Sequence, residues 1–172
     1  MVANADEDDL CVFFYSAHGS NGVDVAPLDE SDGYDEYLCP YDTTSESSMI
    51  RDDELSSWLG ALKTEKLAVF IDTCYSGGQV KTQSAGSQVK TINFSGRVSA
   101  PGDGFVQDLF PIQARDLNDN GFGVVMTACD DDEYSYEIGE LRNGAFTYYL
   151  VQGMAGPADA DSSDVISAEE VF

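Results

Sequence analysis

Short apolar runs alternate with longer polar stretches along this chain, and each run has the length of a buried strand. The runs cover residues 10–16, 67–72 and 123–128. They are apolar at successive positions rather than at every second one, which is typical of parallel strands covered on both faces. The pattern predicts an α/β fold with a mostly parallel sheet.

Two segments carry apolar residues at the three- and four-residue spacing of a helix packed on a sheet. They are residues 52–63 and 144–153. The spaced apolar positions of the first segment are Leu55, Trp58, Leu59 and Leu62. This helix lies between the first two strands, so the unit is a strand-helix-strand crossover, which is almost always right-handed. The crossover brings the ends of both strands to one edge of the sheet.

Polar segments join these elements. Residues 20–48 predict one long loop, interrupted only by residues 37–41, and residues 77–104 predict a mobile loop rich in glycine and serine. Residues 159–172 predict an acidic loop followed by the start of a helix. At 172 residues, the chain has the size of a single domain, which we expect to cover residues 1–172.

The first two strands each end near a reactive side chain. His18 and Gly19 follow the first strand, and Cys74 follows the second. A thiol with an ordinary pKa of about 8.5 is mostly protonated at neutral pH, so a nucleophilic cysteine needs an imidazole or a positive field nearby. His18 is the only histidine in the sequence. Each residue alone is compatible with a structural role, but their matching positions at two strand ends favour a catalytic pair.

Composition narrows the classes of partner. Acidic residues outnumber basic ones by 32 to 8, giving a net charge of −24, so we expect no nucleic-acid partner. The charge alone does not choose between a halophilic surface, calcium sites and a pocket for basic substrates. Four cysteines without a C-x-x-C pair argue against structural zinc and a disulfide framework. With no signal peptide or membrane span in the sequence, we expect a cytoplasmic monomer that does not bind membranes.

Three segments resemble the caspase-like cysteine peptidases, and the metacaspases most closely. They are residues 15–19 (Tyr-Ser-Ala-His-Gly), residues 72–77 (Asp-Thr-Cys-Tyr-Ser-Gly) and residues 127–137. The likeness extends to residues 32–42 and 50–55 and to the helix near the C-terminus. It implies a caspase-like three-layer α/β/α sandwich. It also implies that an N-terminal strand-helix portion is lacking and that the chain is a fragment truncated at both ends, which would leave the first strand as an exposed apolar edge.

The resemblance implies how peptide hydrolysis is divided among these residues. Cys74 attacks the peptide carbonyl, His18 transfers the protons, and the backbone N–H groups of Gly19 and Cys74 hold the oxyanion. Asp72 and Asp131 are implied to bind an arginine or lysine before the scissile bond, with further charge from Glu133, where relatives often have glutamine. A structural alternative for Asp72 is a strand-end aspartate that caps the following turn.

The same resemblance places Asp35, Asp52 and Asp53 at calcium-site positions. Asp52 and Asp53 also begin a predicted helix, where acidic residues complement exposed N–H groups, and this structural role is the alternative. Lys81 stands where the family supplies a further carboxylate.

A second acidic segment has oxygen-bearing residues at the first, third, fifth, ninth and twelfth places of an EF-hand-like loop. These residues are Asp159, Asp161, Ser163, Ser167 and Glu170. Asp164 stands where such loops have glycine, and Ser167 with Glu170 also forms the pattern of a helix capping box, the interpretation that we favour.

The resemblance therefore implies a cysteine endopeptidase that cleaves polypeptides after Arg or Lys. It needs no cofactor for the chemical step, and we expect calcium activation and self-processing at Lys81, Lys90, Arg97 or Arg115. The alternative is a non-catalytic caspase-like scaffold or a calcium-responsive binding module. A cysteine phosphatase is disfavoured, because no arginine follows Cys74 in residues 75–81.

Overall fold

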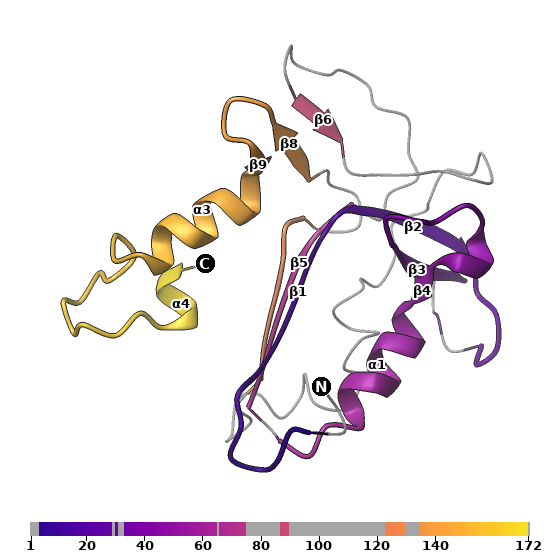
Figure 1. Cartoon of the computed structure of the whole chain (residues 1–172), viewed down its shortest axis with the longest axis horizontal. Helices are drawn as coiled ribbons and strands as arrows, with labels where there is room; N and C mark the ends of the chain where they lie inside the picture. The colour runs from indigo at the N-terminus through magenta and orange to yellow at the C-terminus, as the bar shows by residue number, and fades with distance from the viewer. Residues whose placement is uncertain are drawn as a thin grey trace.

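A parallel sheet forms the centre of the structure, which is a computed structural model (Figure 1). It describes residues 4–28, 30, 33–64, 66–74, 87–89, 123–129 and 135–171. The strands are β1 (Cys11–Ser16), β5 (Leu67–Asp72) and β7 (Gly123–Thr127), in the order β1-β5-β7. Both neighbouring pairs are parallel, and Ser16 lies opposite Asp72 in the register. The ends of β1 and β5 are therefore level, as the crossover predicted.

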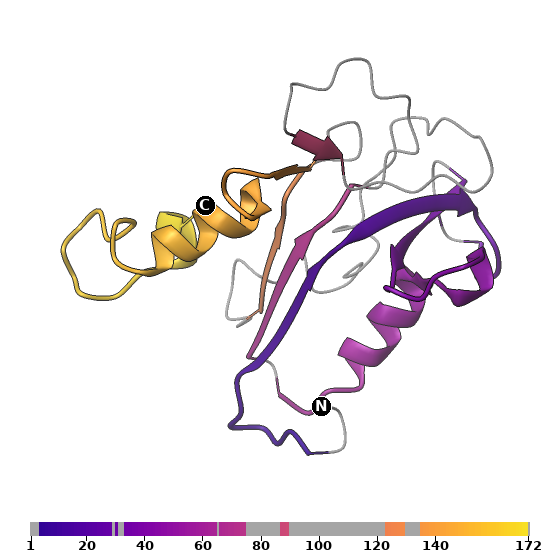
Figure 2. The ribbon, with the colours of Figure 1, turned by 45° about the horizontal axis from the view of Figure 1, so that its top comes forward.

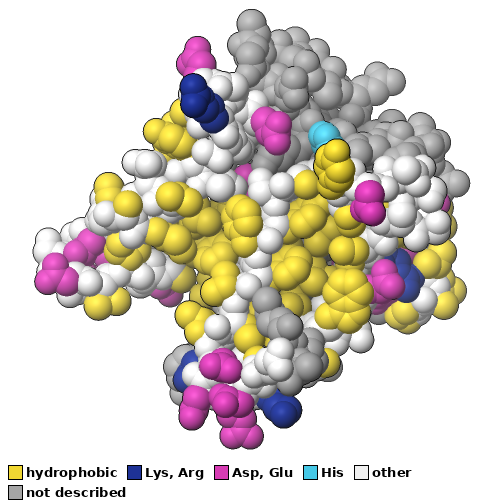
Figure 3. Space-filling view, viewed as in Figure 1, with side chains coloured by type: hydrophobic (Ala, Val, Ile, Leu, Met, Phe, Trp, Pro, Cys, Tyr) yellow, Lys and Arg dark blue, Asp and Glu magenta, His cyan; other side chains and the backbone are white. Residues whose placement is uncertain are grey.

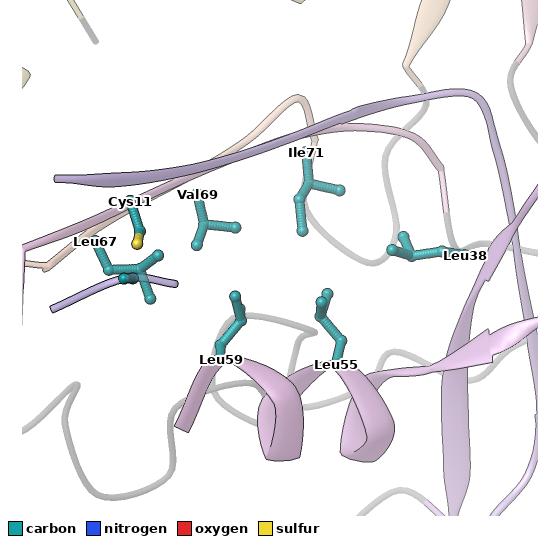
Figure 4. Close-up of a cluster of buried hydrophobic side chains, with 8 residues drawn as sticks. Cys11, Leu38, Leu55, Leu59, Leu67, Val69 and Ile71 are labelled. Atoms are coloured by element: carbon teal, nitrogen blue, oxygen red, sulfur yellow. The ribbon is translucent and has the colours of Figure 1, made fainter. Parts of the chain in front are cut away.

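One face of this sheet is covered by α1 (Asp52–Gly60). Leu55 and Leu59 point from the helix toward Val69 and Ile71 of β5, and all four side chains are buried (Figure 4). The helix ends earlier than the sequence predicted, and Trp58 is half exposed rather than packed. Leu55 and Leu59, four residues apart, define the buried stripe, and Trp58 lies on its flank.

The opposite face of the sheet packs against α3 (Ala145–Met154) and α4 (Ala168–Val171), as Figure 2 shows. Phe70 and Met126 of the sheet meet Leu150 of α3 in a second buried cluster. Side chains at successive strand positions point to opposite faces, so Val69 and Phe70 supply different clusters. The predicted three-layer α/β/α arrangement is confirmed.

A second sheet replaces the long loop predicted for residues 20–48, so that prediction was wrong. Its antiparallel strands are β2 (His18–Val23), β3 (Tyr34–Cys39) and β4 (Ile50–Arg51), with the short 3-10 helix η1 (Glu46–Ser48) before β4. The apolar pattern missed β2 because its buried residues include Ser20 and Asn21, which are polar. Backbone pairing holds these strands together without an alternating apolar face.

A third sheet consists of β6 (Ser87–Val89), β8 (Tyr136–Ile138) and β9 (Asn143–Gly144). The strand β6 falls inside the mobile loop predicted for residues 77–104, so the prediction is wrong at these three residues. The other residues of that loop lie outside the described part of the chain. So do the proposed self-processing sites Lys81, Lys90, Arg97 and Arg115.

At one edge of the described central sheet, β1 exposes apolar side chains. Val12 and Phe14 lie beside Ala68 and Phe70 in the register but are about half exposed. Figure 3 shows apolar side chains gathered across the middle of this view. Within the described residues, no helix is long and apolar enough to cross a membrane. The four cysteines are free thiols.

Candidate active site

The turn that follows β1 lies directly against the turn that follows β5. His18 is the first residue of β2, and Cys74 stands two residues beyond the end of β5. A Cβ atom added to Gly19 would lie 2.6 Å from Thr73 Oγ1 and would also collide with the carbonyl oxygen of Cys74. Only glycine permits this close approach. The structure therefore brings the segment that carries His18 into contact with the segment that carries Cys74.

Tyr15 fixes the backbone at the start of β2. Its hydroxyl lies 2.9 Å from the carbonyl oxygen of His18 and 2.7 Å from that of Cys39, and it donates toward both. Burial raises the pKa of Tyr15, so the hydroxyl remains a donor even at pH values well above neutral. The side chain of His18 is exposed. A rigid backbone thus presents an accessible imidazole at the edge of the sheet.

Cys74 is fully buried beneath Ser135. The Cys74 Sγ lies 3.1 Å from the carbonyl oxygen of Ser135 and 2.6 Å from its backbone nitrogen. A protonated thiol can donate to the carbonyl, and a thiolate can accept from the N–H group. The Ser135 main chain therefore has a partner for the sulfur in either protonation state. Ser135 lies within residues 127–137, but nothing in the sequence of that segment indicates this contact with the sulfur.

Asp72 is fully buried and accepts hydrogen bonds from hydroxyl groups of three separate segments of the chain. Its Oδ1 accepts from the Ser135 hydroxyl at 2.6 Å, and its Oδ2 accepts from the Thr147 hydroxyl at 2.5 Å. The Ser16 hydroxyl lies 3.3 Å from the same Oδ2. The backbone N–H of Thr147, in the first turn of α3, is a fourth donor at 3.4 Å. Asp72 thus also meets the N-terminus of α3. Asp131 and Glu133 lie outside the described residues.

Two of the three predicted calcium residues come together. Carboxylate oxygens of Asp35 and Asp52 lie within 4.8 Å of one another and of Glu30, which sequence reasoning missed. Asp53 is outside this group, and its Oδ2 lies 3.4 Å from the guanidinium of Arg51. The same guanidinium is 3.8 Å from Asp35. Lys81 is outside the described part of the chain.

The environment of Asp35 fits a hard cation. Asp35 is fully buried, and its Oδ1 has no hydrogen-bond partner among the described residues. Burial raises the pKa of Asp35, although the N–H of Val25 and the charge of Arg51 lower it. A divalent cation that prefers oxygen ligands would complete the coordination of this oxygen and offset the cost of its burial.

The second acidic segment forms the predicted capping box. The N–H of Ser167 donates to Glu170 Oε2 at 2.9 Å, and the N–H of Glu170 donates to Ser167 Oγ at 3.3 Å. Hydrogen bonds, led by the one from Ser167, lower the pKa of Glu170. Oxygens of Asp159, Asp161 and Glu170 lie within 4.8 Å of one another. The φ angle of Asp164 is 60°, so it adopts the left-handed conformation that glycine has in EF-hand loops.

Comparisons with known proteins agree with this fold. The sequence model of the Caspase domain family matches residues 1–170. The chain is 34% identical to Metacaspase-3 of Arabidopsis thaliana over 157 residues, which are 87% of this chain and 40% of that protein. It is 30% identical to Metacaspase-1 of the same plant over 161 residues, which are 90% of this chain and 41% of that protein. The chain therefore spans about two fifths of the length of these relatives.

A solved structure supports the fold. The crystal structure of protein GSU0716 from Geobacter sulfurreducens matches with a TM-score of 0.56 at 23% sequence identity. The match covers 91% of this chain and 58% of that protein's chain. At this identity, the likeness concerns the arrangement of strands and helices rather than the chemistry of the site.

Proposed function

This chain belongs to the caspase family, and we propose that it is a cysteine endopeptidase that cleaves peptide bonds after arginine or lysine. The observation that carries the proposal is the contact between Gly19 and Cys74, which sets the turn bearing the only histidine beside the turn bearing the cysteine. An imidazole beside a thiol is the arrangement that supplies a thiolate at neutral pH.

The proposed reaction follows from these positions. His18 takes the proton of the Cys74 thiol, and the sulfur forms a bond to the carbonyl carbon of the substrate. The oxyanion of the tetrahedral intermediate accepts from the backbone N–H groups of Gly19 and Cys74. When the intermediate collapses, the C–N bond breaks and His18 gives its proton to the leaving amine. A water molecule, deprotonated by His18, then hydrolyses the thioester and restores the thiol.

Specificity for a basic side chain is proposed to come from Asp72, with Asp131 as a second acidic residue. A buried carboxylate can bind a guanidinium through two parallel hydrogen bonds or a lysine ammonium through one. Asp72 lies two residues before the nucleophile, so a side chain that reaches it leaves the next peptide bond near Cys74. The position of Asp72 beside the nucleophile supports this role. Asp72 is fully buried, as Cys74 is, so the residues that cover it must move before a substrate side chain can reach it.

Calcium is proposed to bind Asp35, Asp52 and Glu30, with Asp53 beside them. When bound, it would supply positive charge to buried carboxylates and take no part in the chemical step. Asp35 belongs to β3, which pairs with β2, and Asp52 begins α1. A cation between β3 and α1 would therefore stabilise the hairpin whose first strand begins at His18. Activation would follow from ordering this hairpin.

The burial of Cys74 is the observation that favours the alternative, a non-catalytic caspase-like module. A sulfur with no exposed surface cannot meet a substrate unless the residues that cover it move. The two functions differ in whether a peptide gains access to Cys74, which an activity assay decides.

Fluorogenic peptides that differ only in arginine, lysine or the uncharged citrulline before the cleavable bond test the proposal. We expect calcium-dependent cleavage of the two basic peptides by the wild type and none by Cys74→Ala. Addition of a chelator should abolish the activity. Equal cleavage of the citrulline peptide would contradict the specificity, and cleavage by Cys74→Ala would contradict the mechanism.

A further inference from the structure

The carboxylate of Asp72 is oriented by hydroxyl groups that no part of the reaction uses. We propose that Thr147 and Ser135 are positioning residues for the recognition of a basic substrate side chain by Asp72. This inference rests on the proposed function and adds two residues to its specificity pocket. Neither residue stood out in the sequence, because they lie more than sixty positions from Asp72 along the chain.

The contacts of Asp72 leave it little freedom to rotate. The Ser135 hydroxyl holds Oδ1 at 2.6 Å, and the Thr147 hydroxyl and N–H hold Oδ2 at 2.5 and 3.4 Å. Short hydrogen bonds to both oxygens define the plane of the carboxylate. Pairing with a guanidinium requires a carboxylate in a definite plane, because two parallel N–H···O bonds form only in one orientation. Removal of either hydroxyl should therefore weaken the binding of arginine.

Ser135 and Thr147 differ in what else they contact. The main chain of Ser135 also holds Cys74 Sγ, through its nitrogen at 2.6 Å and its carbonyl oxygen at 3.1 Å. Ser135 thus joins the specificity pocket to the nucleophile. No described hydrogen bond links Thr147 to Cys74 or His18. The loss of the Thr147 hydroxyl should change specificity alone. The loss of the Ser135 hydroxyl removes the bond that anchors the Ser135 main chain to Asp72, so it should also change the reactivity of the sulfur that this main chain holds.

The closing experiment measures kcat/KM for the arginine and citrulline peptides with the full chain in calcium. We expect Thr147→Val to lower the value for arginine about tenfold, the effect of losing one hydrogen bond to a charged group, and to change the value for citrulline less than about twofold. Thr147→Ser keeps the hydroxyl and should retain the preference for the arginine peptide that Thr147→Val loses. Ser135→Ala should lower the values for both peptides, with the larger loss for arginine.

Thr64→Val is the matched control. Thr64 is also buried, and its hydroxyl also makes a short hydrogen bond, to the carbonyl oxygen of Asp9. It precedes β5, whereas Asp72 ends that strand. We expect Thr64→Val to lower the melting temperature without changing the ratio of the two kcat/KM values. The comparison of Thr64→Val with Thr147→Val therefore distinguishes the effect of losing a buried hydroxyl on stability from its effect on substrate positioning.

The reference variant is Asp72→Asn, which should abolish the preference for arginine. If Asp72→Asn abolishes it and Thr147→Val leaves the wild-type ratio, the positioning role is wrong and the proposed function stands. Equal losses for both peptides in Thr147→Val, as for a damaged fold, would also overturn the inference. If the wild type cleaves neither peptide, the proposed function falls and the inference falls with it.

Discussion

Replacing Gly19 by alanine tests the contact that brings the two halves of the site together. The added methyl group would stand 2.6 Å from Thr73 Oγ1 and 3.2 Å from the carbonyl carbon of Cys74, and closer still to the carbonyl oxygen. Two of these three atoms belong to the backbone, so a rotation of a side chain cannot relieve the clash. Overpacking of this kind costs about 1–3 kcal/mol. The His18 turn must move away from Cys74 or the free energy of unfolding must fall.

Urea denaturation of the wild type and of Gly19→Ala measures this cost. In a parallel thermal unfolding experiment, a loss of about 1–3 kcal/mol in the free energy of unfolding lowers the melting temperature of a chain of this size by about 2–12 °C. Activity on the arginine peptide should fall as well, because the imidazole is displaced. Gly60→Ala is the matched control, since a Cβ at Gly60 meets no atom within 4 Å and the residue lies in α1. Alanine there should stabilise the helix by up to about 1 kcal/mol.

Opposite signs for the two glycine variants are the expected result. If the stability of Gly19→Ala lies within about 0.5 kcal/mol of the wild type and the activity is unchanged, the His18 and Cys74 turns are not in contact in solution. The mechanism proposed for the pair would then have no structural basis.

Three further predictions concern the surroundings of the site. Tyr15→Phe removes the hydroxyl that holds the carbonyl oxygens of His18 and Cys39. We expect urea denaturation to show a free energy of unfolding lower by about 1 kcal/mol, and the peptide assay to show reduced activity. Unchanged values for both would contradict the role of this hydroxyl. In chelator, burial raises the pKa of Asp35 above its unfolded value, so the folded chain binds the proton more tightly and loses stability as the pH rises through and above the ordinary aspartate range. Asp35→Asn should remove this part of the pH dependence and also the stabilisation by calcium. Melting curves in which calcium still stabilises the variant would contradict the proposed calcium site. Val12→Lys places a charge on the exposed edge strand β1 and should reduce self-association in sedimentation experiments at high concentration. Equal self-association of the wild type and the variant would show that two chains do not meet through this edge.

The central sheet could be predicted from the sequence because its strands and helices bury apolar side chains in regular patterns. Leu55 and Leu59 pack on Val69 and Ile71 as their spacing requires. The contact between the turns that carry the proposed catalytic pair followed from the same pattern, since parallel neighbours that end level bring their next residues together. His18 and Cys74 are each within two residues of such an end.

The other features of the structure could not be predicted, because they depend on polar contacts that show no periodicity along the sequence. The strand β2 buries Ser20 and Asn21, so its sequence resembles a loop. Ser135, just before β8, and Thr147, in the first turn of α3, both reach Asp72 at the end of β5, and no local spacing encodes that contact. Glu30 lies near Asp35 and Asp52 because of the path of a connecting segment, and no pattern in the sequence predicts that path.

Covalent labelling of Cys74 by a peptide chloromethyl ketone with a terminal arginine tests the central claim most directly. The rate is measured from about pH 5 to pH 9 for the wild type and His18→Ala, with the labelled cysteine located by mass spectrometry. Cys39 serves as an internal reference, since burial raises the pKa of its thiol to about 11. The account predicts labelling of Cys74 well below its ordinary pKa of about 8.5, lost in His18→Ala. Equal rates in both chains, or a label on another cysteine, would contradict the claim that His18 activates Cys74.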